Sequence, residues 1–204
     1  MGVFMESINN SNRAEEIMRE SARLFRRKGF SSTSIRNIGD SMGVTSAALY
    51  YHFKNKDEVL FGIMHQGIRY VIDAVETVIA GEELPLDQLK AAVRAHVRVS
   101  LENQDFAAVL LQDLRHLSAE SRSQMIEERD SYETIWSDLL QHCADRGAIA
   151  PDTDLHLLRL MIFGTLNLIV TWYRPEGERS PQEIADTYYR YIFKGVLEVH
   201  DENP

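Results

Sequence analysis

The stretch that most constrains the fold of this chain is GVTSAALYYHFKNK, residues 43–56. Gly43 is a turn residue, and the side chain of Thr45 can cap the helix that follows it. Leu49 and Phe53 lie one turn apart, which puts them on the same face of that helix. A helix this short is not stable alone. Leu49 and Phe53 must therefore pack on neighbouring elements, while small and hydrogen-bonding side chains face outward.

The residues before this stretch predict a second helix joined to it by a tight turn. Apolar residues recur at helical spacing over residues 35–42, and Thr33 or Ser34 can cap that helix. Two helices separated by a short glycine-containing turn form a helix-turn-helix motif, whose second helix enters the major groove of DNA. The alternative is a helical-bundle protein in which the Tyr-Tyr-His sequence is ordinary solvent-exposed surface.

Three short strings in this region resemble the TetR family of one-component transcriptional repressors. Between Asn12 and Val59 the chain contains GF-x-x-TSIR-x-I, then GV-x-x-x-x-LYYHF, then K-x-K. Each string alone is weakly specific, but together and in this order they are strongly specific. The resemblance implies an all-α, nine-helix TetR-type architecture. It would have a three-helix head containing the helix-turn-helix and a helical body for ligand binding and dimerisation.

DNA recognition requires some side chains that approach base edges and others that hold phosphates. We expect Arg36, Ser46 and Ala47 to reach base edges, with Tyr50 close to a base or a phosphate. Side chains expected to hold the sugar-phosphate backbone are Thr33, Tyr51, His52 and Lys56, the last helped by a helix amino terminus. With the cap residue included, the expected DNA-binding residues are Thr33, Arg36, Thr45, Ser46, Ala47, Tyr50, Tyr51, His52 and Lys56.

The charge of the chain is divided unequally along its length. The formal net charge is −9, which by itself disfavours a nucleic-acid partner. Residues 1–56, however, carry 9 Lys and Arg against 5 Asp and Glu, a balance of +4, whereas residues 57–204 carry 13 against 26, a balance of −13. This asymmetry predicts a DNA-binding domain of residues 1–56, with residues 1–11 as a flexible tail. Residues 57–204 would form a ligand-binding and dimerisation domain.

The remaining sequence predicts helices throughout, because no sustained alternation of polar and apolar residues indicates a strand. The first helix is expected over Arg13–Lys28, capped by Asn12 and ended by Gly29. Five further helices are expected in the body, at about 86–101, 105–117, 121–146, 154–173 and from the Ser180-Pro181 dipeptide onward.

A long helix beginning after Asn55 is expected to link the head to the body. Its apolar residues keep a helical period over about twenty residues, a length that spans roughly 30 Å. Gly62 and Gly67 lie within it. They either leave the helix free to move or mark places where another helix crosses closely.

Two carboxy-terminal segments predict a subunit interface. Residues 154–173 are apolar on nearly all sides, so most of that helix must be covered. Together with the final helix they resemble the pair that builds the four-helix dimer interface of TetR-type proteins, although an internal core is the alternative. The expected interface residues are Leu158, Ile162, Leu166, Ile169, Ile184, Tyr188, Tyr191 and Ile192.

Polar residues on otherwise apolar stripes are the candidates for a ligand site. Charged groups are rarely buried unpaired, so each of these residues forms an ion pair, reaches the surface or binds a ligand. The candidate set, with the apolar and aromatic residues around it, is His96, Val109, Asp113, Arg129, Tyr132, Trp136, Arg159 and Asn167. His96 and His116 lack the spacing of a metal site, so no metal and no cofactor is expected. Cys143, the sole cysteine, is expected to be a core residue.

A second resemblance concerns the ligand. The run from Leu160 to Tyr188 is similar to a TetR branch that includes regulators of fatty-acid and sterol breakdown, several of which sense acyl-CoA thioesters. It implies a hydrophobic or acyl-CoA-like inducer, with the phosphates held by arginines such as Arg129, Arg159 and Arg174. The body charge of −13 disfavours such an anion unless arginines are clustered locally.

These observations predict a transcriptional repressor that binds a pseudo-palindromic, double-stranded DNA operator as a homodimer and is released by a small-molecule inducer. The alternatives are an all-α enzyme and a DNA-binding protein without a small-molecule response. The chain has no G-x-S-x-G or H-E-x-x-H motif, which disfavours an enzyme. The apolar run at residues 160–170 is shorter than the roughly 20 residues of a membrane span. We therefore expect no membrane partner and a cytoplasmic location.

Overall fold

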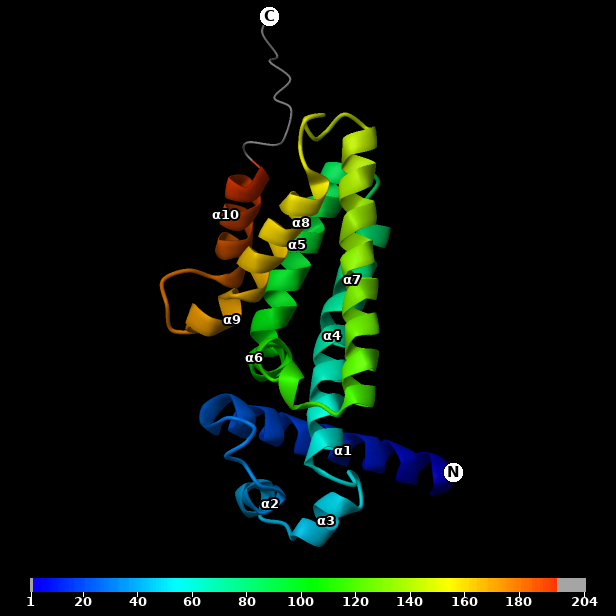
Figure 1. The fold of residues 1–204 in the computed structure, drawn as a ribbon, viewed down its shortest axis with the longest axis vertical. Coiled ribbons are helices and arrows are strands. Elements are labelled where there is room, and N and C mark those ends of the chain that lie inside the picture. The colour runs from blue at the N-terminus through cyan, green and yellow to red at the C-terminus, as the bar shows by residue number, and fades with distance from the viewer. Residues whose placement is uncertain (1, 194–204) are drawn as a thin grey trace, which may run out of the picture. The chain divides into compact units, whose positions relative to one another are not determined.

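The computed structural model describes the backbone of residues 2–193 and the side chains of residues 12–193. All of the regular elements in this part of the chain are helices, which confirms the all-α prediction. They are α1 (Gly2–Lys28), α2 (Ile35–Met42), α3 (Ser46–Tyr50), α4 (Lys56–Ala80), α5 (Pro85–Glu102), α6 (Gln104–Gln112), the 3-10 helix η1 (Leu114–His116), α7 (Ala119–Asp145), α8 (Leu155–Asn167), α9 (Ile169–Trp172) and α10 (Pro181–Phe193) (Figure 1). The nine expected helices are all present, and two of them are divided, at Asp113 and at Leu168.

The described chain forms two compact units. Residues up to Ile68 together with Asn103–Glu128 make the first, here called the head unit. The body unit contains Arg69–Glu102 and the described residues from Arg129 onward. α4 and α7 each run through both units as continuous helices. The head unit is thus larger than the domain expected to end at residue 56, because α6 packs against α1 and the buried Phe106 closes that contact.

α1 begins earlier than expected. The helix starts at Gly2, so Asn12 lies within it rather than capping it, and residues 2–11 are helical rather than a separate flexible tail. Neither proline nor glycine occurs between Val3 and Ser11 to stop a helix there. The carboxy-terminal end is as predicted: Gly29 has a φ of 83°, and its N–H donates to the Phe25 carbonyl at 2.8 Å.

The helix-turn-helix is capped as the sequence predicts. The Ser34 hydroxyl accepts a hydrogen bond from the Asn37 N–H at 3.1 Å at the start of α2. Gly43 ends α2 with a φ of 67°, a left-handed conformation that favours glycine. The Thr45 hydroxyl accepts from the Ala48 N–H at 3.3 Å and so caps α3.

A second glycine, which the sequence analysis missed, makes the turn tight. A Cβ atom at Gly39 would lie 2.8 Å from the carbonyl oxygen of Val44, so no other residue fits without displacing the turn. The Val44 N–H donates to the Gly39 carbonyl at 2.9 Å. Leu49 of α3 packs beside Gly39 and is buried.

Lys56 fixes the start of α4 against the turn between α1 and α2. Its ammonium group donates to the carbonyl oxygens of Phe30 and Thr33, both at 2.8 Å. The same nitrogen lies 4.1 Å from the centre of the Phe30 ring, within the range of a cation–π contact. Desolvation lowers the pKa of Lys56, as expected for a half-buried ammonium.

The two glycines of α4 mark close helix crossings. A Cβ atom at Gly67 would meet the Cβ of Phe106 in α6 at 3.4 Å. A Cβ atom at Gly62 would meet the sulfur of Met18 in α1 at 2.9 Å. Both crossings lie within the head unit, so of the two interpretations left open by the sequence, close packing is the one that the structure supports.

In the body unit, α5 packs against α8 and α10 (Figure 1). Arg94 of α5 forms a two-pronged ion pair with Asp186 of α10, with nitrogen–oxygen distances of 2.6 and 3.0 Å. The break between α8 and α9 has a local cause. The hydroxyl and the N–H of Thr171 both donate to the Leu168 carbonyl, at 2.7 and 3.0 Å, and this competes with the regular helical pattern.

One stretch of the described chain, Leu155–Trp172, is long and apolar enough to cross a membrane by length and composition alone. Its mean hydropathy is 1.5, and 28% of it is buried. This stretch is not one straight helix, because it contains the junction of α8 and α9 at Leu168. The sequence-based expectation rested only on the apolar run at residues 160–170, which is shorter than a membrane span. The longer stretch Leu155–Trp172 does have the length and composition of one.

We predict that Lys56→Ala lowers the free energy of unfolding by about 1–3 kcal/mol, because two carbonyl groups lose their charged hydrogen-bond donor. Lys54→Ala is the matched control, since Lys54 is exposed, and its effect should stay within about 0.5 kcal/mol. Urea denaturation followed by circular dichroism measures both values. Equal losses in the two variants would contradict the structural role of Lys56.

Candidate nucleic-acid interface and ligand site

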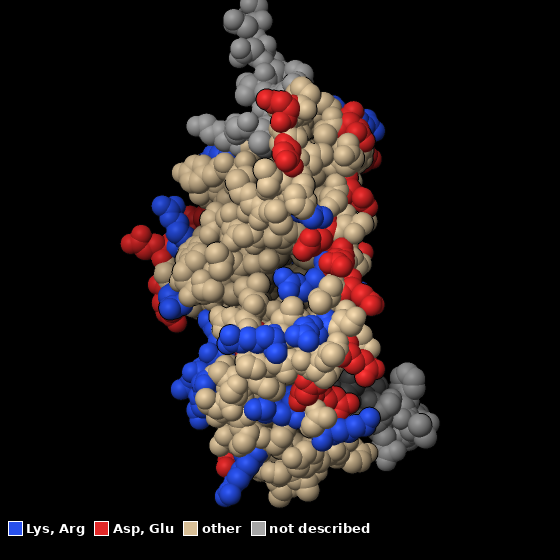
Figure 2. Space-filling model, viewed as in Figure 1, with Lys and Arg blue, Asp and Glu red and all other residues tan. Residues whose placement is uncertain are grey.

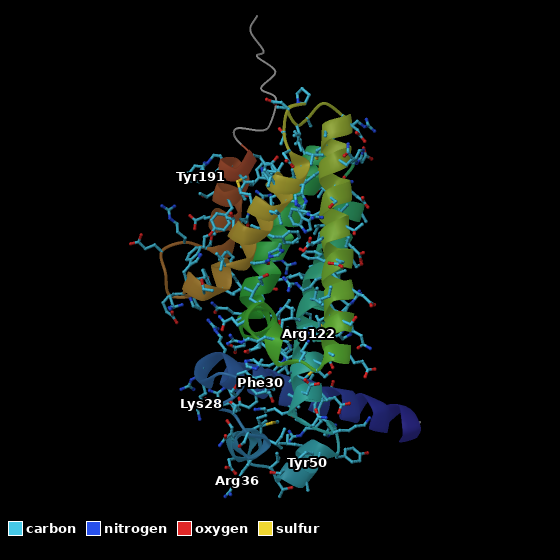
Figure 3. The ribbon with its side chains drawn as sticks, viewed as in Figure 1. Lys28, Phe30, Arg36, Tyr50, Arg122 and Tyr191 are labelled. Atoms are coloured by element: carbon cyan, nitrogen blue, oxygen red, sulfur yellow. The ribbon has the colours of Figure 1, made fainter. Side chains whose placement is uncertain are left out.

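α2, α3 and the turn before α2 enclose a shallow groove on the head unit. Its volume is about 520 Å³. The groove is lined by Ser31, Ser32, Thr33, Ser34, Ile35, Arg36, Ser46, Tyr50, Lys54, Asn55 and Lys56. Hydroxyl, amide and cationic groups therefore dominate it, which suits contact with phosphates and base edges. In Figure 3 the side chains of Arg36 and Tyr50 lie at the outer ends of α2 and α3.

Most of the residues expected to read DNA are accessible on this surface. The side chain of Arg36 is 85% exposed, and its nearest acidic partner, Asp40, is 3.8 Å away. Ala47 and Tyr50 are exposed, and Tyr51 is 78% exposed. Ser46 and His52 are half-buried, and the Tyr51 and His52 rings meet edge to face at 5.1 Å between centroids.

Two of the residues expected to contact the sugar-phosphate backbone of DNA form hydrogen bonds within the protein instead. Thr33 is buried, and its hydroxyl donates to the Gly29 carbonyl at 3.0 Å, so the structure does not offer this side chain to a phosphate. Lys56 uses two of its three N–H donors on the carbonyls of Phe30 and Thr33. The exposed Lys54, which also lines the groove, was not assigned from the sequence, although the K-x-K string contains it.

The candidate ligand residues divide between the two units. Val109 and Asp113 belong to the head unit, where Asp113 follows α6 and lies 3.6 Å from His116. Burial raises the pKa of Asp113, and the cations of His116 and Arg115 oppose that shift. His96, Arg129, Tyr132, Trp136, Arg159 and Asn167 belong to the body unit. The eight residues therefore do not form one site within either unit.

Three of the candidates form an aromatic cluster in the body unit. His96 of α5 and Tyr132 of α7 are joined by a 2.8 Å hydrogen bond between Nδ1 and the phenolic oxygen. The ring of Trp136 lies 6.4 Å from each of them, and Phe163 of α8 lies 5.6 Å from Tyr132. His96, Tyr132 and Trp136 are all buried. Burial lowers the pKa of His96 to about 4, so this histidine is neutral near pH 7.

The charged candidate of α8 is already paired. Arg159 lies 3.3 Å from the carboxylate of Glu133 and donates to the Ser137 hydroxyl at 2.7 Å, both on α7. Asn167 is half-buried at the end of α8. Cys143 is buried, and burial raises the pKa of its thiol to about 11, which favours a core role over reactivity.

Most of the residues expected at the dimer interface do not reach the surface of the described chain. Six of them are buried within the chain itself, so they form its own core. These six are Leu158, Ile162, Leu166, Ile169, Ile184 and Ile192. Only Tyr191, 69% exposed, and the half-buried Tyr188 remain at the surface. A helix that is apolar on all sides has two apolar stripes, and its sequence does not say which one faces the core.

A different apolar stripe is exposed on α8 and beside it. Leu157, Leu160, Met161 and Leu168 follow one another at helical spacing, and all four are exposed. Trp172 of α9 and Tyr191 of α10 are exposed as well. The surface over α8 in Figure 2 carries few charged side chains, whereas acidic side chains follow α7 along the right-hand edge.

The sequence matches known families and known structures over nearly its whole length. Residues 17–63 match the family described as bacterial regulatory proteins, tetR family, and residues 82–196 match the tetracyclin repressor-like, C-terminal domain. The HTH-type transcriptional repressor KstR2 of Mycolicibacterium smegmatis is 26% identical over 190 residues, covering 92% of each chain.

Two solved structures show the same fold. The TetR family transcriptional regulator PfmR of Thermus thermophilus has a TM-score of 0.81 and 30% identity, covering 87% of this chain and 97% of that one. The structure of AibR in complex with isovaleryl coenzyme A and operator DNA has a TM-score of 0.81 and 24% identity, covering 89% and 98%. With the helix-turn-helix geometry described above, the family matches lead to one conclusion: this chain belongs to the TetR family of transcriptional regulators.

Proposed function

We propose that this TetR-family regulator is a repressor that binds a pseudo-palindromic operator as a homodimer and releases it when an acyl-CoA thioester binds the body unit. The observation that carries the DNA-binding half is the groove of the head unit, which is lined by the exposed Arg36 of α2 and Tyr50 of α3, with the exposed Ala47 also on α3. The small side chain of Ala47, near the guanidinium of Arg36 and the phenol of Tyr50, lets α3 approach base edges closely.

In this proposal Arg36 reads a base and Lys54 holds a phosphate. The guanidinium of Arg36 is 85% exposed, and its contact with Asp40 is too long to hold it in place. Lys54 takes over the phosphate role first assigned to Lys56, whose donors are used internally. Ser46, Tyr51 and His52 stay assigned to the DNA surface.

We predict that Arg36→Ala weakens operator binding by about 1–3 kcal/mol and relaxes the preference at one base position. Arg122→Ala is the matched control: Arg122 is an exposed arginine of the same unit on α7, away from the α2–α3 surface in Figure 3. It should leave the affinity unchanged. Fluorescence anisotropy on a panel of operator variants measures both. An Arg36→Ala variant that lost affinity equally for all bases would be a phosphate-contact variant instead.

The apolar stripe of α8 supports the homodimer. Leu157, Leu160, Met161 and Leu168 form one face, while Leu158, Ile162 and Leu166 bury the opposite face in the protein's own core. Gly164 of α8 is exposed and has open space where its side chain would be, so a second copy of α8 can approach closely.

We predict that Leu160→Glu converts the dimer to a monomer of 23.4 kDa, because it buries an unpaired carboxylate in an apolar contact. Leu84→Glu is the control, since Leu84 is an exposed leucine outside α8. Sedimentation equilibrium at micromolar concentration separates the two species. If the Leu160→Glu variant sedimented as a dimer, the interface would lie on another surface.

An acyl-CoA effector is supported by two kinds of observation. The run from Leu160 to Tyr188 resembles regulators of fatty-acid and sterol breakdown, and AibR, a protein with this fold, was solved with isovaleryl coenzyme A and operator DNA. The aromatic cluster of the body unit offers an apolar environment for an acyl chain.

Two continuous helices can carry the effect of a ligand from the body to the head. α4 and α7 each begin in the head unit and continue into the body unit. Their starts are tied together, because the Asp57 carboxylate accepts hydrogen bonds from the Ser118 N–H at 2.9 Å and from the Ser121 hydroxyl at 3.4 Å. A ligand that prefers one arrangement of these helices will shift the spacing of the two recognition helices and so lower operator affinity.

We predict that an acyl-CoA weakens operator affinity by at least about tenfold, a coupling free energy of about 1.4 kcal/mol, whereas free coenzyme A and the free fatty acid do not. Anisotropy of labelled operator with each compound at saturating concentration provides the test. If no acyl-CoA compound released the operator, this ligand class would be excluded, and the assignment as a repressor would still stand.

A further inference from the structure

The aromatic cluster contains two polar atoms that the protein itself leaves without a hydrogen bond. They are Nε2 of His96 and Nε1 of Trp136, and both are buried. His96 is 2% exposed and Trp136 is fully buried. A buried polar group without a hydrogen-bond partner destabilises the protein. A ligand atom that supplied the missing partner would therefore bind more favourably than one that forms a hydrogen bond at the solvent-exposed surface.

The two atoms belong to one connected group of side chains. The rings of His96 and Trp136 are 6.4 Å apart and nearly perpendicular, and Tyr132 lies next to both. Tyr132 satisfies Nδ1 of His96 at 2.8 Å and leaves Nε2 open. Phe163, whose ring lies 5.9 Å from that of Trp136, and Asn167 are half-buried, whereas His96, Tyr132 and Trp136 are buried.

Two polar side chains lie near the open atoms without completing a hydrogen bond to them. The Asn167 amide is close enough to His96 to raise the pKa of the imidazole, which partly offsets the lowering caused by burial. The indole of Trp136 likewise lowers the pKa of Tyr132, which partly offsets the rise caused by burial. Neither contact has the geometry of a hydrogen bond at Nε2 or Nε1. The polar groups of the cluster are therefore close together and still incompletely satisfied.

The chemistry of the two open atoms defines what they can bind. The indole Nε1 of Trp136 is a donor only. When the Tyr132 hydroxyl donates to Nδ1 of neutral His96, Nε2 of His96 carries the hydrogen and is a donor as well. In this tautomer the cluster presents two donors, which an oxygen acceptor would satisfy.

The acceptor should be neutral. His96 is uncharged near pH 7, because burial lowers its pKa to about 4. The charge of Arg159 on α8 is already compensated by Glu133, and one of its nitrogens donates to Ser137, although its Nε is also buried without a hydrogen bond. A carboxylate or a phosphate would have to lose its hydration beside a neutral imidazole, whereas a carbonyl oxygen would find two hydrogen-bond donors at little desolvation cost.

We propose that Trp136 Nε1 and His96 Nε2 bind the carbonyl oxygen of the thioester in an acyl-CoA effector, an assignment that rests on the ligand class of the proposed function. The aromatic rings of Tyr132, Trp136 and Phe163 pack against the first carbons of the acyl chain. With this contact the protein would distinguish a thioester from free coenzyme A and from a free acid.

Matched ligand pairs test this assignment. Each pair consists of an acyl-CoA and the S-alkyl-CoA thioether of the same chain length, which lacks only the carbonyl oxygen; short, medium and long chains are compared. Isothermal titration calorimetry of the wild-type dimer should show thioester binding about tenfold tighter than thioether binding for the chain length that fits. A tenfold ratio corresponds to about 1.4 kcal/mol, the size of a net hydrogen bond.

The variant Trp136→Phe removes the indole N–H and keeps an aromatic ring. It should abolish the preference for the thioester, while the affinity for the thioether changes by less than about threefold, or roughly 0.7 kcal/mol. The control is Trp172→Phe, which changes the exposed tryptophan of α9 and should keep the preference. Thermal melting of each variant accompanies the titrations, and the thioether affinity reports whether the pocket is intact.

Three results would overturn the inference, and they differ in what they imply. Equal binding of thioester and thioether to the wild type, or equal loss of both in Trp136→Phe, would show that the cluster packs against the ligand without binding its carbonyl. The proposed function would then survive. Binding of neither compound at any chain length would overturn both this inference and the acyl-CoA class of the proposed function.

Discussion

The DNA-binding surface depends on how a five-residue helix is held in place. α3 comprises Ser46–Tyr50 and is far below the length at which a helix is stable in water. Its position is set from outside: Thr45 caps it, Leu49 anchors it in the core, and the turn before it closes tightly only because Gly39 has no side chain. These contacts set the direction of the α3 side chains that are proposed to face DNA, whereas Arg36 lies on α2.

The same surface is fixed to the rest of the head unit by one cation. The Lys56 ammonium holds the carbonyls of Phe30 and Thr33 and lies over the Phe30 ring. Phe30 in turn stacks on His116 of η1 at 5.1 Å. The segment between α6 and α7 thus contacts the turn in front of α2, which is why α6 and the start of α7 form one compact unit with the helix-turn-helix.

The sequence predicted best what is decided locally. Caps at Ser34 and Thr45 and the left-handed Gly43 follow from side chains that bond to their own backbone, so a few neighbouring residues suffice to predict them. Family resemblance supplied the fold. The errors concern choices that only packing makes, such as the buried use of Thr33, the internal use of Lys56 and the helical residues before Asn12. The burial of residues expected at the dimer interface has the same origin, because Leu158 and Leu160 are chemically alike and only packing buries one and leaves the other exposed.

In the proposed function, two copies of this chain read a symmetric DNA site with paired α3 helices. Selection of bound sequences from random DNA by the purified protein, followed by footprinting and by sedimentation of the complex, tests it directly. We predict an inverted repeat with half-sites about 34 Å apart or a multiple of that spacing, each occupied by one subunit. A single asymmetric site bound by one subunit would contradict the proposed binding of an operator by a homodimer.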